Sequence, residues 1–336
     1  MLSRPNGGTD LGYGALVDGT IGQSPLIELD RSLTGGACVY AKCEFLSPTG
    51  SHKDRLYKHA IRTLEREGRI RPGMTLIDFS SGNAGAALAM LGTLRGYRVV
   101  IVRPSGLSRE KAVQILAYGA RLVFTPSGLG VPGARKRALA LSRRLGAECF
   151  LMYQTDSELN RNAYYSCGLE IVRQFQERRR RIDAFVCGIG TGGTLTGASR
   201  AIKEYYPRAK IIAVEMKESA VLYQRRRGRP LRLHRHHLEG LSTGELYANL
   251  DIRLIDDVVL CSEREAISCQ KQITRGAKML VGPTSGANLF GAKKVAVMLG
   301  RRATIVTVFS DSAWKYFSET RLPSSVEQHL TRTKFL

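Results

Sequence analysis

The sequence predicts an α/β fold of two three-layer lobes, each a mainly parallel sheet covered by helices on both sides. Short β-branched runs alternate with helical stretches along the chain, and this alternation is typical of parallel sheets. The alternation falls into two separate series, which indicates two sheets rather than one. With 336 residues, 43% of them hydrophobic and 24% charged, the chain is large enough to bury two cores.

The first series covers residues 74–153. Its predicted strands are MTLIDF (74–79), RVVIV (98–102), RLVFT (121–125) and CFLMY (149–153). Its predicted helices are NAGAALAMLGTLRG, SREKAVQILAYG and ARKRALALSRRLG. The second helix is expected to bury the apolar residues Ala112, Val113, Ile115 and Leu116, because their spacing matches one helix face.

The second series begins with a long helix from Glu158 through Gln176. Its predicted strands are DAFVCGI, KIIAVE, VVLCS, MLVG and TIVTVF, and its further helices are TLTGASRAIKEYY, EREAISCQKQI and a stretch from Ser285. Three predicted strands lead into small-residue loops at which a helix begins: SSGNAG (80–85), GIGTGGT (188–194) and PTSGAN (283–288). Ligands of open α/β sheets bind beyond the carboxyl ends of the strands, so we expect these loops to line one site.

Composition narrows the class of function. The net charge of +22 makes binding to nucleic acid or to another acidic partner a candidate function. However, the dense basic runs at 177–181 and 224–237 are short, and no RNA-binding or zinc-finger pattern accompanies them. We therefore predict a solvated basic face first, attraction of an anionic substrate second, and nucleic acid only third.

The sequence predicts no metal site, disulfide framework or membrane segment. The seven cysteines form no C-x-x-C pair and are interpreted as reduced thiols. The histidines of the HRHH stretch stand among arginines, which is a poor environment for a metal cation. Because neither a membrane-length apolar run nor a signal-peptide pattern is present, we expect a cytoplasmic protein.

The GIGTGGT loop alone admits three interpretations. Its backbone N–H groups, between a strand and a helix, can hold a phosphate. Gly188, Gly190 and Gly193 also satisfy G-x-G-x-x-G, and Glu215 ends the next strand, as in a dinucleotide site. A purely structural turn is the third interpretation.

Two other segments favour the phosphate interpretation. Ser80, Ser81 and Asn83 offer hydroxyl and amide groups at a helix start, suited to a carboxylate or phenolate oxygen, although simple helix capping would use the same residues. Lys53 stands among small residues in SPTGSHKDR, as a reactive lysine would. A dinucleotide explains neither segment, whereas a cofactor with one phosphate, one phenolic oxygen and one aldehyde uses all three.

The ordered set SPTGSHKDR, SSGNAG, GIGTGGT and GPTSGAN resembles the cysteine synthase and cystathionine β-synthase family of fold type II pyridoxal-phosphate enzymes. The likeness runs from about Gly22 to Glu319. It implies a fold like the tryptophan synthase β subunit, with pyridoxal 5′-phosphate in the cleft between the lobes, a small amino-acid substrate and a homodimer. The expected divisions are a small mobile domain at 46–157, a large domain at 15–45 plus 158–320, and peripheral tails at 1–14 and 321–336.

The resemblance also implies roles for residues. Lys53 matches the lysine that binds the cofactor covalently and moves the substrate's α-proton, and Asn83 matches the asparagine that hydrogen-bonds the cofactor's 3′-oxygen. The residues that match the phosphate loop are Gly190, Thr191, Gly192, Gly193 and Thr194. The residues that match the substrate-carboxylate site are Ser80, Ser81 and Gln154. Thr284 matches the residue that faces the pyridine nitrogen.

These roles fit the chemistry of the side chains. A lysine amine reacts only when neutral, so burial or a neighbouring cation must lower its pKa. A hydroxyl at the ring nitrogen makes the ring a weaker electron sink than a carboxylate would, which favours expulsion of a β-substituent. Asp54 and Arg55 are expected to be a helix-start acid and a member of a structural ion pair.

The implied reaction is β-replacement on O-acetyl- or O-phospho-L-serine through an aminoacrylate, with sulfide as the default nucleophile, giving L-cysteine. Departures from the family pattern leave the nucleophile and the leaving group open: Ala84, YQT (153–155), LEGLSTG (238–244) and FSDSAWKYFSE.

Addition of an amine or amino acid is the second candidate reaction, because ELNRNAYYSCGLEIV resembles diaminopropionate-type synthases. Dehydratase-like deamination is third, and a non-catalytic binding protein remains the rival from another class. The Arg run at 225–229 precedes LEGLSTG, the segment that borders the active-site mouth in the family, and could bind a phosphate leaving group, but a solvated charge run is the favoured interpretation.

Overall fold

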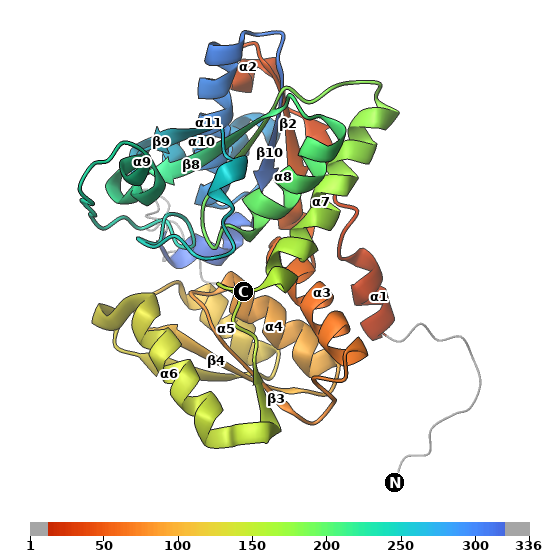
Figure 1. The fold of residues 1–336 in the computed structure, drawn as a ribbon, viewed down its shortest axis with the longest axis vertical. Coiled ribbons are helices and arrows are strands. Elements are labelled where there is room, and N and C mark those ends of the chain that lie inside the picture. Colours follow the sequence, from red (N-terminus) through yellow and green to blue (C-terminus); the bar gives the residue numbers. More distant parts are fainter. Residues whose placement is uncertain (1–12, 320–336) are drawn as a thin grey trace, which may run out of the picture.

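The computed structural model describes residues 13–319, which form two lobes (Figure 1). The four-stranded lobe is built on a parallel sheet of order β5-β4-β3-β6. Its strands are β3 (Thr75–Phe79), β4 (Arg98–Pro104), β5 (Arg121–Thr125) and β6 (Cys149–Leu151). Its helices are α3 (Lys53–Arg66), α4 (Asn83–Leu94), α5 (Arg109–Ala117) and α6 (Gly130–Leu145).

The six-stranded lobe has the sheet order β1-β2-β10-β7-β8-β9, in which only the β1–β2 pair is antiparallel. Its strands are β1 (Leu26–Glu28), β2 (Cys38–Cys43), β7 (Ala184–Gly188), β8 (Lys210–Met216), β9 (Asp257–Cys261) and β10 (Thr304–Phe309). Its helices are α2 (Arg31–Thr34), α7 (Glu158–Glu177), α8 (Gly193–Tyr205), α9 (Val221–Arg226), α10 (Glu263–Ala277) and α11 (Pro283–Leu299). The helix α1 (Tyr13–Thr20) precedes β1 in the chain but packs beside α3 on the four-stranded lobe, where Val17 joins the core that contains Leu56 (Figure 1). Short 3₁₀ turns η1 to η6 lie at 44–46, 127–129, 146–148, 217–219, 252–254 and 313–319.

The predicted fold class is confirmed, because both sheets are mainly parallel and helices cover them. β3 and β10 are buried along their whole length, as expected for β-branched runs in the middle of covered sheets. The short antiparallel pair β1–β2 was not predicted. The domain boundaries stay a prediction, and most of the predicted tails, residues 1–12 and 321–336, lies outside the described residues.

Two details of the prediction are wrong. MLVG (279–282) is not a strand but a partly buried connection, in which Val281 makes an isolated bridge to Ser312 and Leu280 is exposed. A short apolar run does not distinguish a buried strand from such a connection. On α5, Val113 and Leu116 are exposed, whereas Lys111 and Ile115 are buried. The helix is therefore present, but it turns a different face to the interior from the one that its apolar residues predict.

Close packing of α7 on α8 positions the GIGTGGT loop, which ends where α8 begins. A Cβ atom on Gly197 of α8 would lie 2.2 Å from the backbone oxygen of Arg161, and one on Gly168 of α7 would lie 2.6 Å from that of Ala198. These distances are shorter than real Cβ contacts, so the two backbones approach as closely as glycine permits. Among residues 13–319, no helix combines the length and the apolar character needed to span a membrane.

We predict that Gly197→Ala destabilises the protein by about 1–3 kcal/mol, because overpacking forces the two helices apart. Urea unfolding of the purified variant measures this change. Gly128→Ala is the matched control, since a Cβ atom there meets no atom within 4 Å. Equal unfolding midpoints for the two variants would contradict the prediction.

Candidate active site

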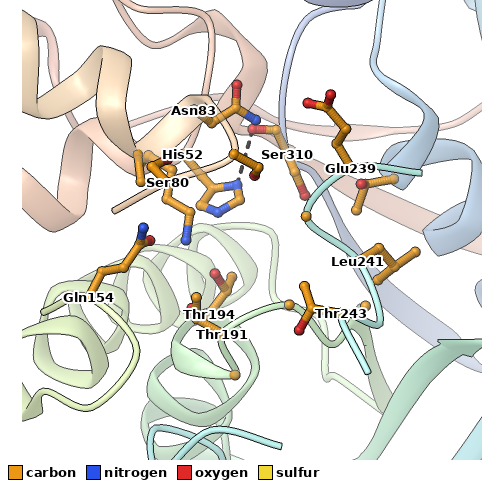
Figure 2. A pocket seen from close by; sticks show the side chains of 18 of the residues that line it. His52, Ser80, Asn83, Gln154, Thr191, Thr194, Glu239, Leu241, Thr243 and Ser310 are labelled. Carbon is orange, nitrogen blue, oxygen red and sulfur yellow. Dashed lines mark hydrogen bonds between the residues drawn. The ribbon is translucent and has the colours of Figure 1, made fainter. Parts of the chain in front are cut away.

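One cavity is lined by residues of both lobes, and every predicted site residue except Gly193 lines it. From the four-stranded lobe come Lys53, Ser80, Ser81, Asn83 and Gln154. From the six-stranded lobe come Gly190, Thr191, Gly192, Thr194 and Thr284. Figure 2 shows Ser80 and Asn83 on one side of this cavity and Thr191 and Thr194 on the opposite side. The structure therefore brings together loops that lie far apart in the sequence.

The GIGTGGT loop forms the part of the cavity where α8 begins. Gly192 has φ +84° and precedes the helix, and a Cβ atom on Gly190 would lie 2.3 Å from the Gly240 oxygen. The first N–H groups of a helix have no partner within the helix, and its dipole favours negative charge there. The loop can therefore hold a phosphate. Gly193 serves packing instead, since its Cβ atom would lie 1.9 Å from Asn160 Oδ1.

Lys53 is the first residue of α3, and its environment favours the neutral amine. Burial lowers the pKa of Lys53 to about 8, although the Asp78 carboxylate acts in the opposite direction. Burial, together with the charge of Lys53, also lowers the pKa of His52 well below its usual range. A neutral His52 ring can donate from Nδ1 to the Ser310 carbonyl oxygen, 3.2 Å away (Figure 2).

Asp78 is a buried carboxylate of β3 that the sequence analysis did not single out. It accepts hydrogen bonds from the Tyr57 hydroxyl and from the Phe79 backbone N–H. Burial raises the pKa of Asp78 to about 7, while its hydrogen bonds and the Lys53 charge act to lower it. Asp78 and Lys53 therefore influence each other's charge at neutral pH.

Ser80 and Gln154 use part of their hydrogen-bonding capacity within the protein. Ser80 Oγ accepts from the backbone N–H groups of Gly82 and Gly85, both at 3.0 Å, as a capping residue does. Gln154 Nε2 donates to the Phe79 oxygen at 2.9 Å. Ser81 is half-buried at the cavity wall. The capping role is thus observed for Ser80, whose hydroxyl can still donate one hydrogen bond.

Lys111 and Glu239 form a buried ion pair in the cavity wall that sequence reasoning missed. Glu239 also accepts from the Ser108 backbone N–H at 2.9 Å, and the Lys111 ammonium lies 3.7 Å from the centre of the Tyr316 ring. Lys111 lies in a helix whose apolar residues were predicted to form the buried face, so the sequence pattern does not mark Lys111 as buried. Glu239 lies in LEGLSTG, whose departure from the family pattern was the available signal.

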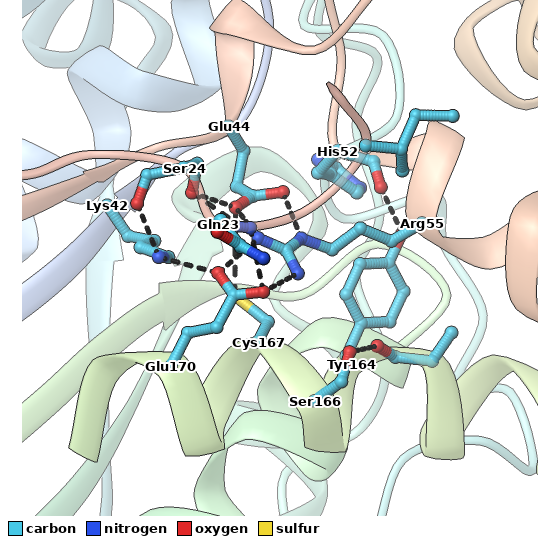
Figure 3. A network of polar contacts seen from close by, with 12 residues as sticks. Gln23, Ser24, Lys42, Glu44, His52, Arg55, Tyr164, Ser166, Cys167 and Glu170 are labelled. Atoms are coloured by element: carbon cyan, nitrogen blue, oxygen red, sulfur yellow. Dashed lines mark hydrogen bonds and ion pairs between the residues drawn. The ribbon is translucent and has the colours of Figure 1, made fainter. Parts of the chain in front are cut away.

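The Arg55 guanidinium lies between the carboxylates of Glu44 and Glu170, which confirms the predicted structural ion pair (Figure 3). Burial alone would raise the pKa of Glu170, but Arg55 and Lys42 lower it to about 2. Asp54 lies in the first turn of α3, as predicted, and accepts from the Thr49 backbone N–H at 2.8 Å. Both residues support the fold around Lys53.

The Arg run at 225–229, for which a solvated charge run is the favoured interpretation, contributes no residue to the lining of the cavity. Arg226 of α9 donates to the carbonyl oxygens of Ile252 and Ile255, and Arg227 packs over the Tyr223 ring. Within residues 13–319, no arginine lines the cavity. The basic run is instead held to the surface of its own lobe.

Known proteins resemble this chain along most of its length. Residues 17–311 match a family described as pyridoxal-phosphate dependent enzyme. A Staphylococcus aureus cysteine synthase is 34% identical over 300 residues, 89% of this chain and 94% of that protein. A crystal structure of O-ureido-L-serine synthase is 30% identical with a TM-score of 0.84, covering 94% of this chain and 98% of that one. An O-acetylserine dependent cystathionine β-synthase from Helicobacter pylori is 30% identical with a TM-score of 0.83, covering 90% and 97%.

We predict that attachment of pyridoxal phosphate to the unloaded protein speeds up as pH rises, with a midpoint near pH 8. Only the neutral amine reacts, and the pKa of Lys53 is lowered to about 8 from 10.5. Stopped-flow absorbance between pH 6.5 and 10 measures the midpoint. Asp78→Asn should move it to lower pH, because the Asp78 carboxylate raises the pKa of Lys53. A midpoint above pH 10 would show that Lys53 is an ordinary lysine.

Proposed function

Since the chain belongs to the family of pyridoxal-phosphate dependent enzymes and to its cysteine synthase type, we propose that it converts O-acetyl-L-serine and sulfide to L-cysteine and acetate. The observation that carries the proposal is the convergence of Lys53, the SSGNAG loop and the GIGTGGT loop on one cavity. The homodimer and the cytoplasmic location stay predictions.

The lining residues fit pyridoxal phosphate. In our proposal the start of α8 takes the phosphate, Asn83 faces the ring oxygen, Thr284 faces the ring nitrogen and Lys53 meets the aldehyde. The close packing of the loop requires glycine at 190 and 192, because a Cβ atom there would collide with Gly240 or Leu250. Bound pyridoxal phosphate supplies the aldehyde that takes up the substrate amine and a ring that withdraws electrons from its α-carbon.

The protein's own groups carry the remaining steps. The hydroxyls of Ser80 and Ser81 and the start of α4 receive the substrate carboxylate. Lys53 Nζ removes the proton from the α-carbon, after which the bond between the β-carbon and the acetate oxygen breaks. Sulfide then forms a bond to the β-carbon, and Lys53 returns its proton to the α-carbon. This sequence needs a neutral Lys53 at the start, which its lowered pKa provides.

An acetyl leaving group suits the cavity better than a phosphoryl group. The start of α8 is assigned to the cofactor phosphate, so a substrate phosphate would depend on arginine or an unpaired lysine, and no arginine lines the cavity within the described residues. Lys111 is already neutralised by Glu239. A second phosphate would therefore meet no free countercharge beyond Lys53, whereas an acetyl ester needs none.

Addition of an amine or amino acid is the second candidate reaction. The Thr243 and Tyr247 hydroxyls and the Glu239 carboxylate make part of the cavity wall polar, and sulfide requires none of these groups. A structurally similar protein is an O-ureido-L-serine synthase, which shows that this fold accommodates products other than cysteine. Deamination is distinguished by the release of pyruvate without any added nucleophile.

We predict that kcat/KM for O-acetyl-L-serine exceeds that for O-phospho-L-serine by at least about tenfold, because the phosphoryl charge is unpaired in the cavity. Steady-state assays with sulfide, and with amino acids in its place, measure this ratio and identify the nucleophile. Arg225→Ala is the control and should leave both substrates unaffected, because Arg225 lies outside the cavity. Preference for the phosphorylated substrate would reject the acetyl assignment.

A further inference from the structure

Asp311 is a buried carboxylate at the cavity to which the proposed reaction assigns no role. It follows β10, is 1% exposed and lines the cavity. Its backbone is bridged to Ser51, and the adjacent Ser310 carbonyl oxygen accepts from the His52 N–H at 2.9 Å. Asp311 is therefore fixed beside the segment that carries Lys53.

The Asp311 side chain holds Asn83 across the cavity, from one lobe to the other. Asn83 Nδ2 donates to Asp311 Oδ2 at 2.6 Å, and the Tyr316 hydroxyl donates to the same oxygen at 2.5 Å. A carboxylate only accepts, so the amide nitrogen, and not the amide oxygen, must face Asp311. Since an amide is planar, fixing one N–H also fixes the directions of the other N–H and of the C=O.

Two buried side-chain oxygen atoms at this contact have no hydrogen-bond partner within residues 13–319. These atoms are Asn83 Oδ1 and Asp311 Oδ1. Buried polar atoms are almost always paired in folded proteins, so these two acceptors at the cavity wall point to a bound group that brings a hydrogen-bond donor, and the second N–H of Asn83 is left for an acceptor. Asn83 is the residue whose amide we assign to the cofactor's ring oxygen.

Gly282 provides the space for the Asp311 carboxylate. A Cβ atom at this position would lie 2.1 Å from Asp311 Oδ1. The backbone of Gly282 has φ −71° and ψ 167°, which any residue adopts, so the backbone does not require glycine here. Glycine is required because the Asp311 carboxylate occupies the space that a side chain at 282 would need.

We propose that Asp311 is a positioning residue that fixes the amide plane of Asn83 at the ring oxygen of pyridoxal phosphate. The inference rests on the proposed place of Asn83 in the cofactor site. Asp311 acts through Asn83: its carboxylate accepts from one N–H of the amide, and the second N–H is then directed at the ring oxygen. Hydrogen bonding at that oxygen tunes the electronics of the ring, so the absorbance of the bound cofactor reports it.

Asp311→Asn tests the inference, because it keeps the size of the side chain and removes the charge that binds the amide. We expect the dissociation constant for pyridoxal phosphate to rise about tenfold and the visible absorbance band to shift. Ser312→Ala is the control: it removes a part-buried hydrogen bond from the neighbouring residue to the Phe45 oxygen and leaves Asn83 unchanged. Its spectrum and affinity should match the parent protein.

A double-mutant cycle separates positioning from a general structural effect. In an Asn83→Ala background, Asp311→Asn should change neither the spectrum nor the affinity further. An undiminished effect in that background, or an unchanged spectrum in the single variant, overturns the inference. Gly282→Ala, which displaces the Asp311 carboxylate without removing it, should reproduce the spectral shift and serves if Asp311→Asn does not fold.

The same cycle distinguishes this inference from the proposed function. If Asn83→Ala alone leaves the spectrum and affinity unchanged, the assignment of Asn83 to the ring oxygen fails and the role of Asp311 fails with it. Turnover of O-acetyl-L-serine with sulfide would persist in that case. Loss of the spectral effect and loss of the activity are therefore separate outcomes.

Discussion

The cavity depends on the buried ion cluster around Arg55, which fixes the helix that begins at Lys53. Arg55 Nε lies 2.7 Å from Glu44, and its terminal nitrogens bond both oxygens of Glu170 (Figure 3). Arg55 belongs to α3 of the four-stranded lobe, whereas both carboxylates belong to the six-stranded lobe. Removing one partner of a buried pair typically costs about 3–5 kcal/mol. This cluster thus ties the lysine to the lobe that supplies the phosphate loop.

Further contacts between the lobes lie in the cavity wall itself. Asn83 bonds Asp311, and Lys111 pairs with Glu239, each across the junction of the lobes. Because every one of these groups is buried, each is costly to leave unpaired. The same bonds that hold the lobes together therefore also place the side chains of the cavity. A change in the arrangement of the lobes would necessarily change the site.

The sequence predicted those features that depend on local pattern. Buried β-branched runs predicted most of the strands, and the motifs SPTGSHKDR, SSGNAG, GIGTGGT and GPTSGAN predicted residues that line the cavity. Features decided by distant partners were missed. Lys111 resembles any solvated lysine until Glu239 is brought to it, and Asp311 acquires its place only through Asn83 and Gly282. The strand β1 was missed because three residues carry too little periodicity.

Covalent attachment of the cofactor at Lys53 can be measured directly. Lys315 is the strongest alternative attachment site, because burial also lowers the pKa of Lys315 to about 8. However, Lys315 does not line the cavity. The loaded protein is reduced with borohydride and digested, and the pyridoxyl group is located by peptide mass spectrometry. The geometry predicts that the label lies on Lys53 alone. A label on Lys315 or Lys111, with Lys53 unmodified, would contradict the proposed site.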